Sequence, residues 1–247
     1  KTRVLLYQMC ATNIAPLLAV TSVSTADGGS PILKRIGKTD TIRVGMTGTR
    51  APFNMKNRDG NLIGMDVDLA QLLSNAMGVQ LEIVEMPFAE LLPALEDGKI
   101  DLVMSGMTAT LQRNLRVPFV GPYYISGKSL LTKSETIATI QSAEEMNNER
   151  LSVAALAGST SEQFVRATLS KPKLVSTNSL EEAIRLLRTG EVDAVVADSP
   201  TCALSVLRCP EDKLIALQNP LTIEPIGIAL APGDPLLVNL VQNYMQA

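Results

Sequence analysis

The stretch that decides the fold runs from Phe88 to Arg113 and reads Phe-Ala-Glu-Leu-Leu-Pro-Ala-Leu-Glu-Asp-Gly-Lys-Ile-Asp-Leu-Val-Met-Ser-Gly-Met-Thr-Ala-Thr-Leu-Gln-Arg. A leucine stripe at helical spacing predicts an amphipathic helix that ends at Gly98. The run 101–105 then predicts a short buried strand, followed by small and hydroxyl-bearing residues. A guanidinium group at the carboxyl end of such a strand suits a carboxylate ligand, because its planar fork matches the two oxygens.

This stretch resembles the core of the type 2 periplasmic solute-binding proteins, specifically the polar amino-acid binders of bacterial extracellular solute-binding family 3. The pattern of that family is an aromatic residue, then Leu-x-Pro-x-Leu, Gly-Lys-x-Asp and Ser-x-Met-Thr-x-Thr-x-x-Arg, and all of it is present in order. The resemblance implies an α/β protein with the two-lobe type 2 periplasmic-binding-protein fold. Each lobe would be a mixed sheet flanked by helices, and two hinge crossings would join the lobes.

Composition limits the possible functions. The chain has 247 residues, of which 46% are hydrophobic and 19% are charged, so it can form a sizeable core. With 22 basic and 25 acidic residues and no basic run, a general nucleic-acid surface is not expected. Histidine is absent, which excludes a histidine base and a histidine-ligated metal. We expect no metal and no cofactor.

The three cysteines give no metal or redox motif. They are Cys10, Cys202 and Cys209, and none forms a Cys-x-x-Cys pair. If Cys202 and Cys209 share one helix, they are about 10 Å apart along its axis, which is too far for a disulfide. If the helix ends near Arg208, they could pair. Two unpaired thiols are the simpler interpretation.

The amino-terminal part has the character of an export signal. Residues 1–26 combine a basic start, an apolar middle and small residues before Ala26, as a secretory signal peptide does. Polar residues interrupt the apolar part, so a loosely packed extension is the alternative. Residues 27–40 have the composition of a linker. No run of about 20 apolar residues occurs, so no standard transmembrane helix is predicted. We expect a periplasmic protein, or one located outside the cytoplasm without a lipid anchor.

The order of predicted elements is typical of α/β sheets. Predicted strands are 41–46, 81–85, 101–105, 129–132, 152–156, 173–175, 193–198 and 226–231. Besides the helix that ends at Gly98, predicted helices are 64–77, 140–146, 160–167, 179–190 and 236–245. Asp66 or Asp68 is expected to cap the first of these, because its carboxylate suits the positive end of a helix.

One pattern occurs twice in the chain. A helix, Gly-x-x-Asp and an apolar strand appear at 98–104 and again at 190–196. This repeat and the family both imply two α/β lobes of similar plan. We assign residues 41–130 and 224–247 to a discontinuous lobe 1, and residues 131–223 to lobe 2.

By the resemblance, one group of residues binds the α-carboxylate of an amino acid. Arg113 matches the family's carboxylate clamp, and Thr108 matches a hydroxyl and amide that bind the same group. Thr160 matches the partner from the second lobe, at a helix start where backbone amides also favour an anion. The alternative for Arg113 is a surface position or a structural ion pair.

A second group would bind the rest of the ligand. By the resemblance, Asp198 pairs with the α-ammonium, and Ser105 offers its backbone carbonyl to it. Gly106 stands where many relatives carry a serine, so only its backbone can act. Phe88 matches the aromatic residue that packs on the ligand side chain. The alternatives are a helix cap for Asp198 and core packing for Phe88.

Arg50 is the main departure from the family pattern. Many relatives carry an aromatic residue there, just before the Ala-Pro-Phe segment. A buried cation needs a partner, which an anionic or strongly hydrogen-bonding ligand side chain could supply. Because Asp198 is reserved for the ammonium, we expect that it cannot neutralise Arg50. The alternative is that Arg50 faces solvent or pairs with a local carboxylate.

These features predict a non-catalytic, monomeric protein that binds an α-amino acid, preferably with an acidic or amide side chain. It would deliver the ligand to the membrane permease of an ABC-type transporter. One alternative on the same fold is an enzyme like cyclohexadienyl dehydratase, which needs a general acid. After Asp198, however, the next carboxylate in the sequence is Glu211. The other alternative is a ligand-sensing input domain.

Overall fold

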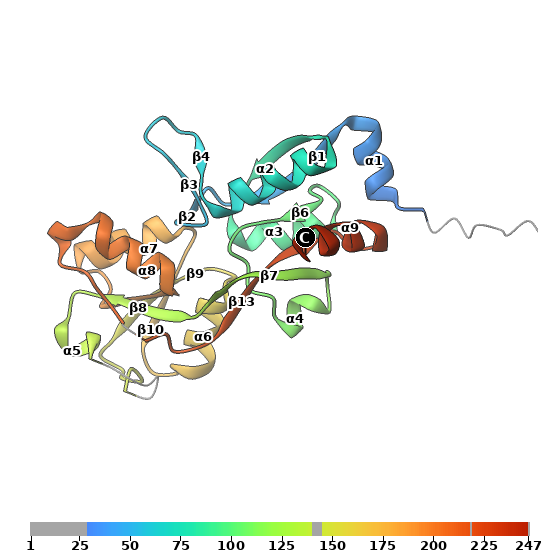
Figure 1. Ribbon diagram of the computed structural model, residues 1–247. Helices are drawn as coiled ribbons and strands as arrows, with labels where there is room; N and C mark the ends of the chain where they lie inside the picture. Colours follow the sequence, from blue (N-terminus) through green and yellow to red (C-terminus); the bar gives the residue numbers. More distant parts are fainter. Residues whose placement is uncertain (1–28, 140–144, 218, 247) are drawn as a thin grey trace, which may run out of the picture.

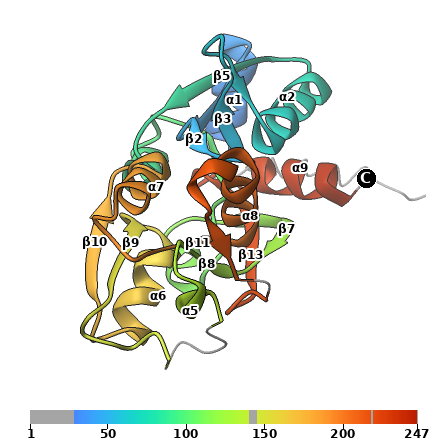
Figure 2. The ribbon, with the colours of Figure 1, turned by 90° about the vertical axis from the view of Figure 1, so that its left-hand side faces the viewer.

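The computed structural model describes residues 29–139, 145–217 and 219–246. These residues form two lobes, each built around its own five-stranded sheet (Figure 1). The chain passes from the first lobe to the second and returns, so that its last helix packs in the first lobe (Figure 2). The predicted two-lobe α/β fold is confirmed.

The sheet of the first lobe has the strand order β5-β1-β6-β13-β7. β1 pairs in parallel with β5 and β6, whereas β13 is antiparallel to β6 and β7. The strands are β1 (Thr41–Met46), β5 (Gln80–Glu85), β6 (Leu102–Val103), β7 (Phe119–Ser126) and β13 (Glu224–Leu230). The helices are α2 (Met65–Met77), α3 (Phe88–Glu96), α4 (Leu111–Asn114) and α9 (Pro235–Gln246).

The sheet of the second lobe repeats this plan with the order β10-β9-β11-β8-β12. β9 is parallel to β10 and β11, and β8 is antiparallel to β11 and β12. The strands are β8 (Lys128–Thr132), β9 (Ser152–Leu156), β10 (Lys173–Thr177), β11 (Ala194–Asp198) and β12 (Ile215–Ala216). The helices are α5 (Glu135–Ala138), α6 (Thr160–Thr168), α7 (Leu180–Thr189) and α8 (Ser199–Arg208), followed by a 3-10 turn, η1 (Pro210–Asp212).

The repeated Gly-x-x-Asp pattern has the same structural role in both lobes. Asp101 accepts a hydrogen bond from the backbone N–H of Arg43, near the start of β1, at 2.8 Å. Asp193 accepts one from the backbone N–H of Ser152, at the start of β9, at 2.7 Å. Each aspartate thus fixes a helix-to-strand turn to the neighbouring parallel strand. This explains why the same short sequence occurs once in each lobe.

The segment predicted as a linker contains a helix, α1 (Pro31–Thr39). The prediction was wrong there because the helix is capped from a distant part of the chain. The carboxylate of Asp234 accepts hydrogen bonds from the backbone N–H groups of Ile32 and Leu33 at 2.9 and 3.0 Å, and from the Ser30 hydroxyl. The helix also packs against α9. No pattern in the sequence near α1 indicates that a residue as distant as Asp234 caps it.

The two crossings between the lobes lie against each other. β7 belongs to the first sheet and β8 to the second, so the first crossing is at Gly127, before the boundary predicted at residue 130. A Cβ atom on Gly127 would lie 2.2 Å from the carbonyl oxygen of Thr222, which is in the second crossing. The backbone N–H of Lys128 donates to the hydroxyl of Thr222 at 2.9 Å. Glycine at this position therefore lets the crossings pack closely.

A small antiparallel sheet projects from the first lobe. It consists of β2 (Thr49–Arg50), β3 (Asn54–Lys56) and β4 (Leu62–Ile63), and β2 contacts α7 of the second lobe (Figure 2). The contact matters because it places residue 50 at the boundary between the lobes.

Some predictions fall outside the described residues. They are the signal peptide at 1–26, Cys10, and most of the predicted helix 140–146, of which residues 140–144 are not described. Cys202 and Cys209 are unpaired, Cys202 lying within α8 and Cys209 directly after it. None of the helices in the described ranges is both long and apolar enough to cross a membrane.

Candidate functional site

Phe88 contacts two arginines near the boundary between the lobes. It is the first residue of α3, and only 3% of its surface is exposed. The Cζ atom of Arg50 lies 4.8 Å from the centroid of the ring, and that of Arg113 lies 5.6 Å from it. Both distances suit cation–π contacts. Since the ring also belongs to the largest hydrophobic cluster, the two roles considered for Phe88 are compatible.

Arg113 makes hydrogen bonds to both lobes. Its Nη1 donates to the carbonyl of Thr108 at 2.8 Å, and its Nη2 donates to the carbonyl of Gly158 in the second lobe at 3.1 Å. The local sequence fixes its backbone, because the hydroxyl of Thr110 caps α4 by accepting from the Arg113 N–H at 3.2 Å. Burial lowers the pKa of Arg113 to about 10, and the nearby charge of Arg50 acts in the same direction.

Thr108 and Thr160 face each other across the two lobes. Their hydroxyl oxygens are 3.3 Å apart, and both residues are buried. Thr160 begins α6, whose cap is the hydroxyl of Ser159 accepting from the N–H of Glu162 at 3.2 Å. The three residues expected to bind a carboxylate, Arg113, Thr108 and Thr160, are therefore close together. That they bind a carboxylate remains a prediction.

Asp198 is bound by two buried cations. One of its oxygens accepts from the guanidinium of Arg50, and the other accepts from Lys128 Nζ at 2.7 Å. Lys128 Nζ also lies 3.6 Å from Glu224 Oε2. Together with Arg113, whose pKa responds to Arg50, Glu224 and Asp198, these residues form what we call the charged cluster. Burial raises the pKa of Asp66 and the charge of Arg50 opposes this, so Asp66 belongs to the cluster too. The cluster then holds three cations and three carboxylates.

The pairing of Arg50 with Asp198 contradicts the prediction that Asp198 is unavailable to Arg50. The two form a buried ion pair between the lobes. Arg50 does not face solvent, since only 3% of its surface is exposed. Asp198 precedes α8, but its side chain makes no capping hydrogen bond. Burial alone would raise the pKa of Asp198, but the charges of Lys128 and Arg50 outweigh it and lower the pKa.

Gly106 makes room for Arg50. Its φ angle is +56°, and a Cβ atom there would lie 2.7 Å from Arg50 Nε. The departure from the family pattern at residue 50 and the glycine at 106 therefore depend on each other. Arg50 Nε is itself buried and has no hydrogen-bond partner among the described residues. A buried donor of this kind favours a ligand atom that can accept from it.

Ser105 and Asp66 make hydrogen bonds that hold the segments next to Gly106 in place. The hydroxyl of Ser105 accepts from the backbone N–H of Thr47 at 3.2 Å and from Asn54 Nδ2 at 3.3 Å. The expectation that Asp66 caps α2 was wrong, since that helix has no side-chain cap. Asp66 instead accepts from the backbone N–H of Gly106 at 2.9 Å. Asp66 therefore binds a distant backbone N–H group instead of capping its own helix.

Sequence reasoning missed Lys128 and Glu224. Lys128 begins the strand Lys-Ser-Leu-Leu-Thr, in which all five residues are buried, and a fully buried lysine is unusual. The sequence of this strand, with only two apolar residues, gives no signal of that burial. Glu224 begins β13, where nothing in the local sequence distinguishes it from a surface residue. Both reach the charged cluster only because the two crossings pack together.

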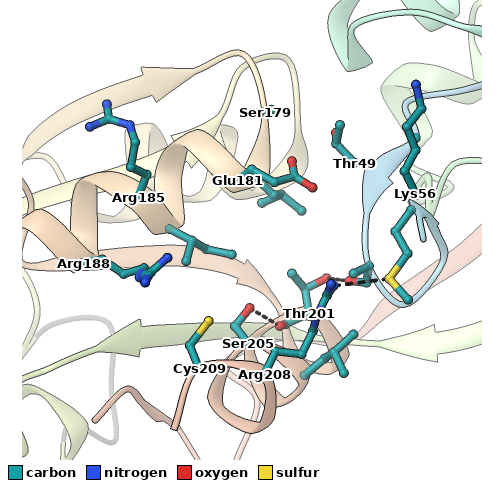
Figure 3. Close-up of a pocket in the computed structure, with 16 residues that line it drawn as sticks. Thr49, Lys56, Ser179, Glu181, Arg185, Arg188, Thr201, Ser205, Arg208 and Cys209 are labelled. Atoms are coloured by element: carbon teal, nitrogen blue, oxygen red, sulfur yellow. Dashed lines mark hydrogen bonds between the residues drawn. The ribbon is translucent and has the colours of Figure 1, made fainter. Parts of the chain in front are cut away.

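A separate cavity of about 680 Å³ lies between the small sheet and helices α7 and α8 (Figure 3). Its lining mixes apolar residues with Glu181 and several basic side chains. At one wall, the hydroxyl of Thr201 donates to the carbonyl of Ala51 at 2.8 Å, which links the lobes next to Arg50. None of the predicted ligand-binding residues lines this cavity.

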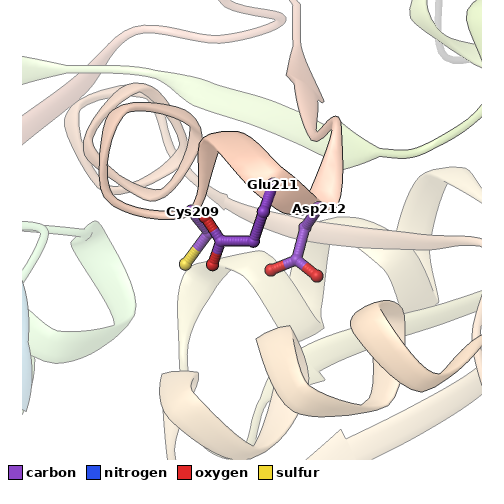
Figure 4. A group of neighbouring side chains, drawn as sticks. All are labelled: Cys209, Glu211 and Asp212. Carbon is purple, nitrogen blue, oxygen red and sulfur yellow. The ribbon is translucent and has the colours of Figure 1, made fainter.

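Three potential metal ligands also gather after α8. They are Cys209, Glu211 and Asp212, whose ligand atoms lie within 4.8 Å of one another (Figure 4). Asp212 Oδ2 is 2.6 Å from Nε of Arg188, so this carboxylate is already neutralised. An acidic surface group with such a partner gives no reason to assign a metal.

The chain matches one protein family over most of its length. Residues 42–246 match the bacterial extracellular solute-binding proteins, family 3. The L-arginine-binding protein of Pseudomonas aeruginosa is 34% identical over 201 residues, which cover 78% of this chain and 76% of that protein. The cyclohexadienyl dehydratase of the same organism is 27% identical over 228 residues, covering 92% and 85%.

A solved structure agrees with these matches. The crystal structure of an ancestral amino-acid-binding protein, a precursor of cyclohexadienyl dehydratase, superposes with a TM-score of 0.80 and 36% identity. The alignment covers 87% of this chain and 92% of that one.

Proposed function

Because this chain belongs to family 3 of the bacterial extracellular solute-binding proteins, we propose that it binds an α-amino acid with an acidic or amide side chain. It delivers this ligand, as a monomer outside the cytoplasm, to the permease of an ABC-type transporter. Arg113, Thr108 and Thr160 bind the α-carboxylate. Asp198, with the Ser105 carbonyl and the Gly106 backbone, receives the α-ammonium, and Phe88 packs on the side chain.

In this proposal, buried Arg50 is the residue that selects the side chain of the ligand. Its buried Nε donor has no hydrogen-bond partner among the described residues. A carboxylate or amide oxygen satisfies such a donor, whereas a lysine or arginine side chain adds a like charge in a desolvated space. Asp198 can keep its ion pair with Arg50 and still accept from an ammonium, because a carboxylate has about four lone-pair sites.

The charged cluster does not favour catalysis. A dehydratase on this fold requires a proton donor, but the pKa of Asp198 is lowered by Lys128 and Arg50. A carboxylate held between two cations favours its ionised form and is a poor acid at neutral pH. We therefore propose binding without chemistry.

Calorimetry with a panel of amino acids tests the proposal. The protein is first freed of co-purified ligand by unfolding and refolding, then titrated with glutamate, aspartate, glutamine, asparagine, lysine and arginine. Acidic or amide ligands should bind more tightly than basic ones. Arg50→Gln should weaken their binding, whereas Arg58→Gln, an exposed arginine in the turn after β3, should not. Tighter binding of lysine or arginine by the wild type contradicts the proposal, as does turnover of a cyclohexadienyl substrate.

A further inference from the structure

Asp66 is a buried carboxylate to which the proposed function gives no role. It lies in the first turn of α2, and its surface is fully buried. Its Oδ1 accepts from the hydroxyl of Tyr123 at 2.6 Å, and its Oδ2 accepts from Asn54 Nδ2 at 2.7 Å and from the backbone N–H of Gly106 at 2.9 Å. All three partners donate, and hydrogen bonds of this direction favour the ionised carboxylate.

Asp66 is connected to Arg50 through two of these partners. Arg50 in β2 pairs in register with Asn54 in β3, which donates to Asp66. Gly106, which also donates to Asp66, is the residue whose missing Cβ makes room for Arg50 Nε. All of these contacts lie within the first lobe, whereas the ion pair of Arg50 with Asp198 joins the two lobes. The connection to Asp66 therefore does not depend on how far the lobes are closed.

The charge of Asp66 determines which ligand side chain suits Arg50. Asp198 pairs directly with Arg50, and Asp66 acts on it as a second negative charge. With Asp66 ionised, the charged cluster holds as many carboxylates as cations. A ligand carboxylate would add an uncompensated charge to this buried space. An amide oxygen can accept from Arg50 Nε, which has no partner among the described residues, without adding a charge.

Building on the proposed function, we propose that Asp66 is a specificity-determining residue that acts through Arg50. It holds the wall of the site on which Arg50 lies, and its charge makes the site select an amide side chain over an acidic one. The proposal narrows the acidic or amide class to neutral amide amino acids, such as glutamine and asparagine. Asp66 is a positioning residue in this account, because it binds the segments around Arg50 and not the ligand.

Asp66→Asn tests the charge and keeps the hydrogen bonds. The remaining oxygen can accept from Asn54 and Gly106, and the new amino group can donate to the oxygen of Tyr123. Calorimetry measures the Kd of glutamate and glutamine, and of aspartate and asparagine as a shorter pair. The readout is the Kd of the acid divided by the Kd of the amide. Because charges in a desolvated site interact strongly, this ratio should exceed about tenfold in the wild type and fall by at least about tenfold in Asp66→Asn.

The same change in an Arg50→Gln background separates an effect through Arg50 from a general structural effect. There, Asp66→Asn should alter the ratio by less than about twofold, because the residue through which it acts is gone. Asp68→Asn is the matched control, since Asp68 lies in the same turn of α2 but is exposed, and it should leave the wild-type ratio unchanged. Circular dichroism and thermal unfolding show whether each variant folds. If Asp66→Asn does not fold, the wild-type ratio alone decides.

The remaining outcomes separate the two proposals. An unchanged ratio in folded Asp66→Asn protein overturns the inference, as does an equal change in the Arg50→Gln background. A wild-type protein that binds glutamate or aspartate more tightly than the amides also overturns it, but leaves the proposed function standing. Tighter binding of lysine or arginine contradicts the proposed function, and the inference with it.

Discussion

Some residues at the boundary between the lobes depend on the identity of their neighbours. Arg50 needs the missing Cβ of Gly106, and its guanidinium needs the carboxylate of Asp198. A Gly106→Ser change would introduce a side chain 2.7 Å from Arg50 Nε as well as an unfavourable φ angle. We therefore expect that replacing Arg50 alone or Gly106 alone disturbs the site, although many relatives carry other residues at both positions.

Arg113→Ala should abolish measurable amino-acid binding. The ligand carboxylate would lose a charge-assisted pair of hydrogen bonds, which costs on the order of 3–5 kcal/mol, or more than about a hundredfold in affinity. Calorimetry measures the loss, and circular dichroism checks that the variant is folded. Arg116→Ala is the matched control, because Arg116 lies in the same segment but is paired with Glu96 at the surface. Wild-type affinity in a folded Arg113→Ala protein would disprove the carboxylate assignment.

Among the elements, α1 depends most on distant parts of the chain. The side chain of its cap residue Ser30 makes no capping hydrogen bond, and the carboxylate of Asp234, just before α9, takes that role. The same carboxylate accepts from the backbone N–H of Leu237 at 3.0 Å. One aspartate thus holds the starts of two helices, and the negative charge suits the positive end of each helix dipole.

Asp234→Ala should destabilise the protein by about 1–3 kcal/mol, the cost of leaving buried helix-start N–H groups without their acceptor. Burial alone would raise the pKa of Asp234, but hydrogen bonds from Ser30, Leu237, Leu33 and Ile32 lower it. Its contribution is therefore complete above the unfolded pKa of about 3.9 and is lost as the pH falls through the lower folded pKa.

Urea unfolding at several pH values measures both effects. Between about pH 4 and pH 2, the wild type should lose more stability than Asp234→Ala, because only the wild type has this carboxylate to protonate. Parallel curves for the two proteins over that range would show that Asp234 is not responsible.

In the whole molecule, hydrogen bonds and ion pairs connect the two lobes, among them the pair of Lys128 with Glu224. Besides Arg50 with Asp198, they include Thr108 with Thr160, Arg113 with the Gly158 carbonyl, and Thr201 with the Ala51 carbonyl. The two hinge crossings lie side by side, at Gly127–Lys128 and Thr222, so a rotation at both would turn the lobes as bodies. We expect ligand binding to close the lobes about these crossings.

Small-angle scattering tests closure, since the radius of gyration should fall at saturating ligand. Thr201→Val should shift the ligand-free protein toward the open form and weaken binding about threefold to tenfold, because one inter-lobe hydrogen bond is lost. Ser205→Ala is the control: its hydroxyl donates at 2.8 Å to the carbonyl of Thr201 within the same helix and crosses no boundary. An unchanged scattering profile with bound ligand would exclude lobe closure.

The sequence by itself determined the two-lobe fold, because its elements depend on local patterns, whereas the ligand-binding roles of the site residues stay predictions. Gly98 and Gly190 follow helices with positive φ angles, and the hydroxyls of Ser159 and Ser179 cap helices. Such signals act within a few residues. Only the tertiary structure decided which charges meet. Arg50, Lys128 and Asp198 come from three separate segments, and their pairing depends on how two lobes and two crossings pack. Burial then makes those pairings strong, since water no longer screens the charges.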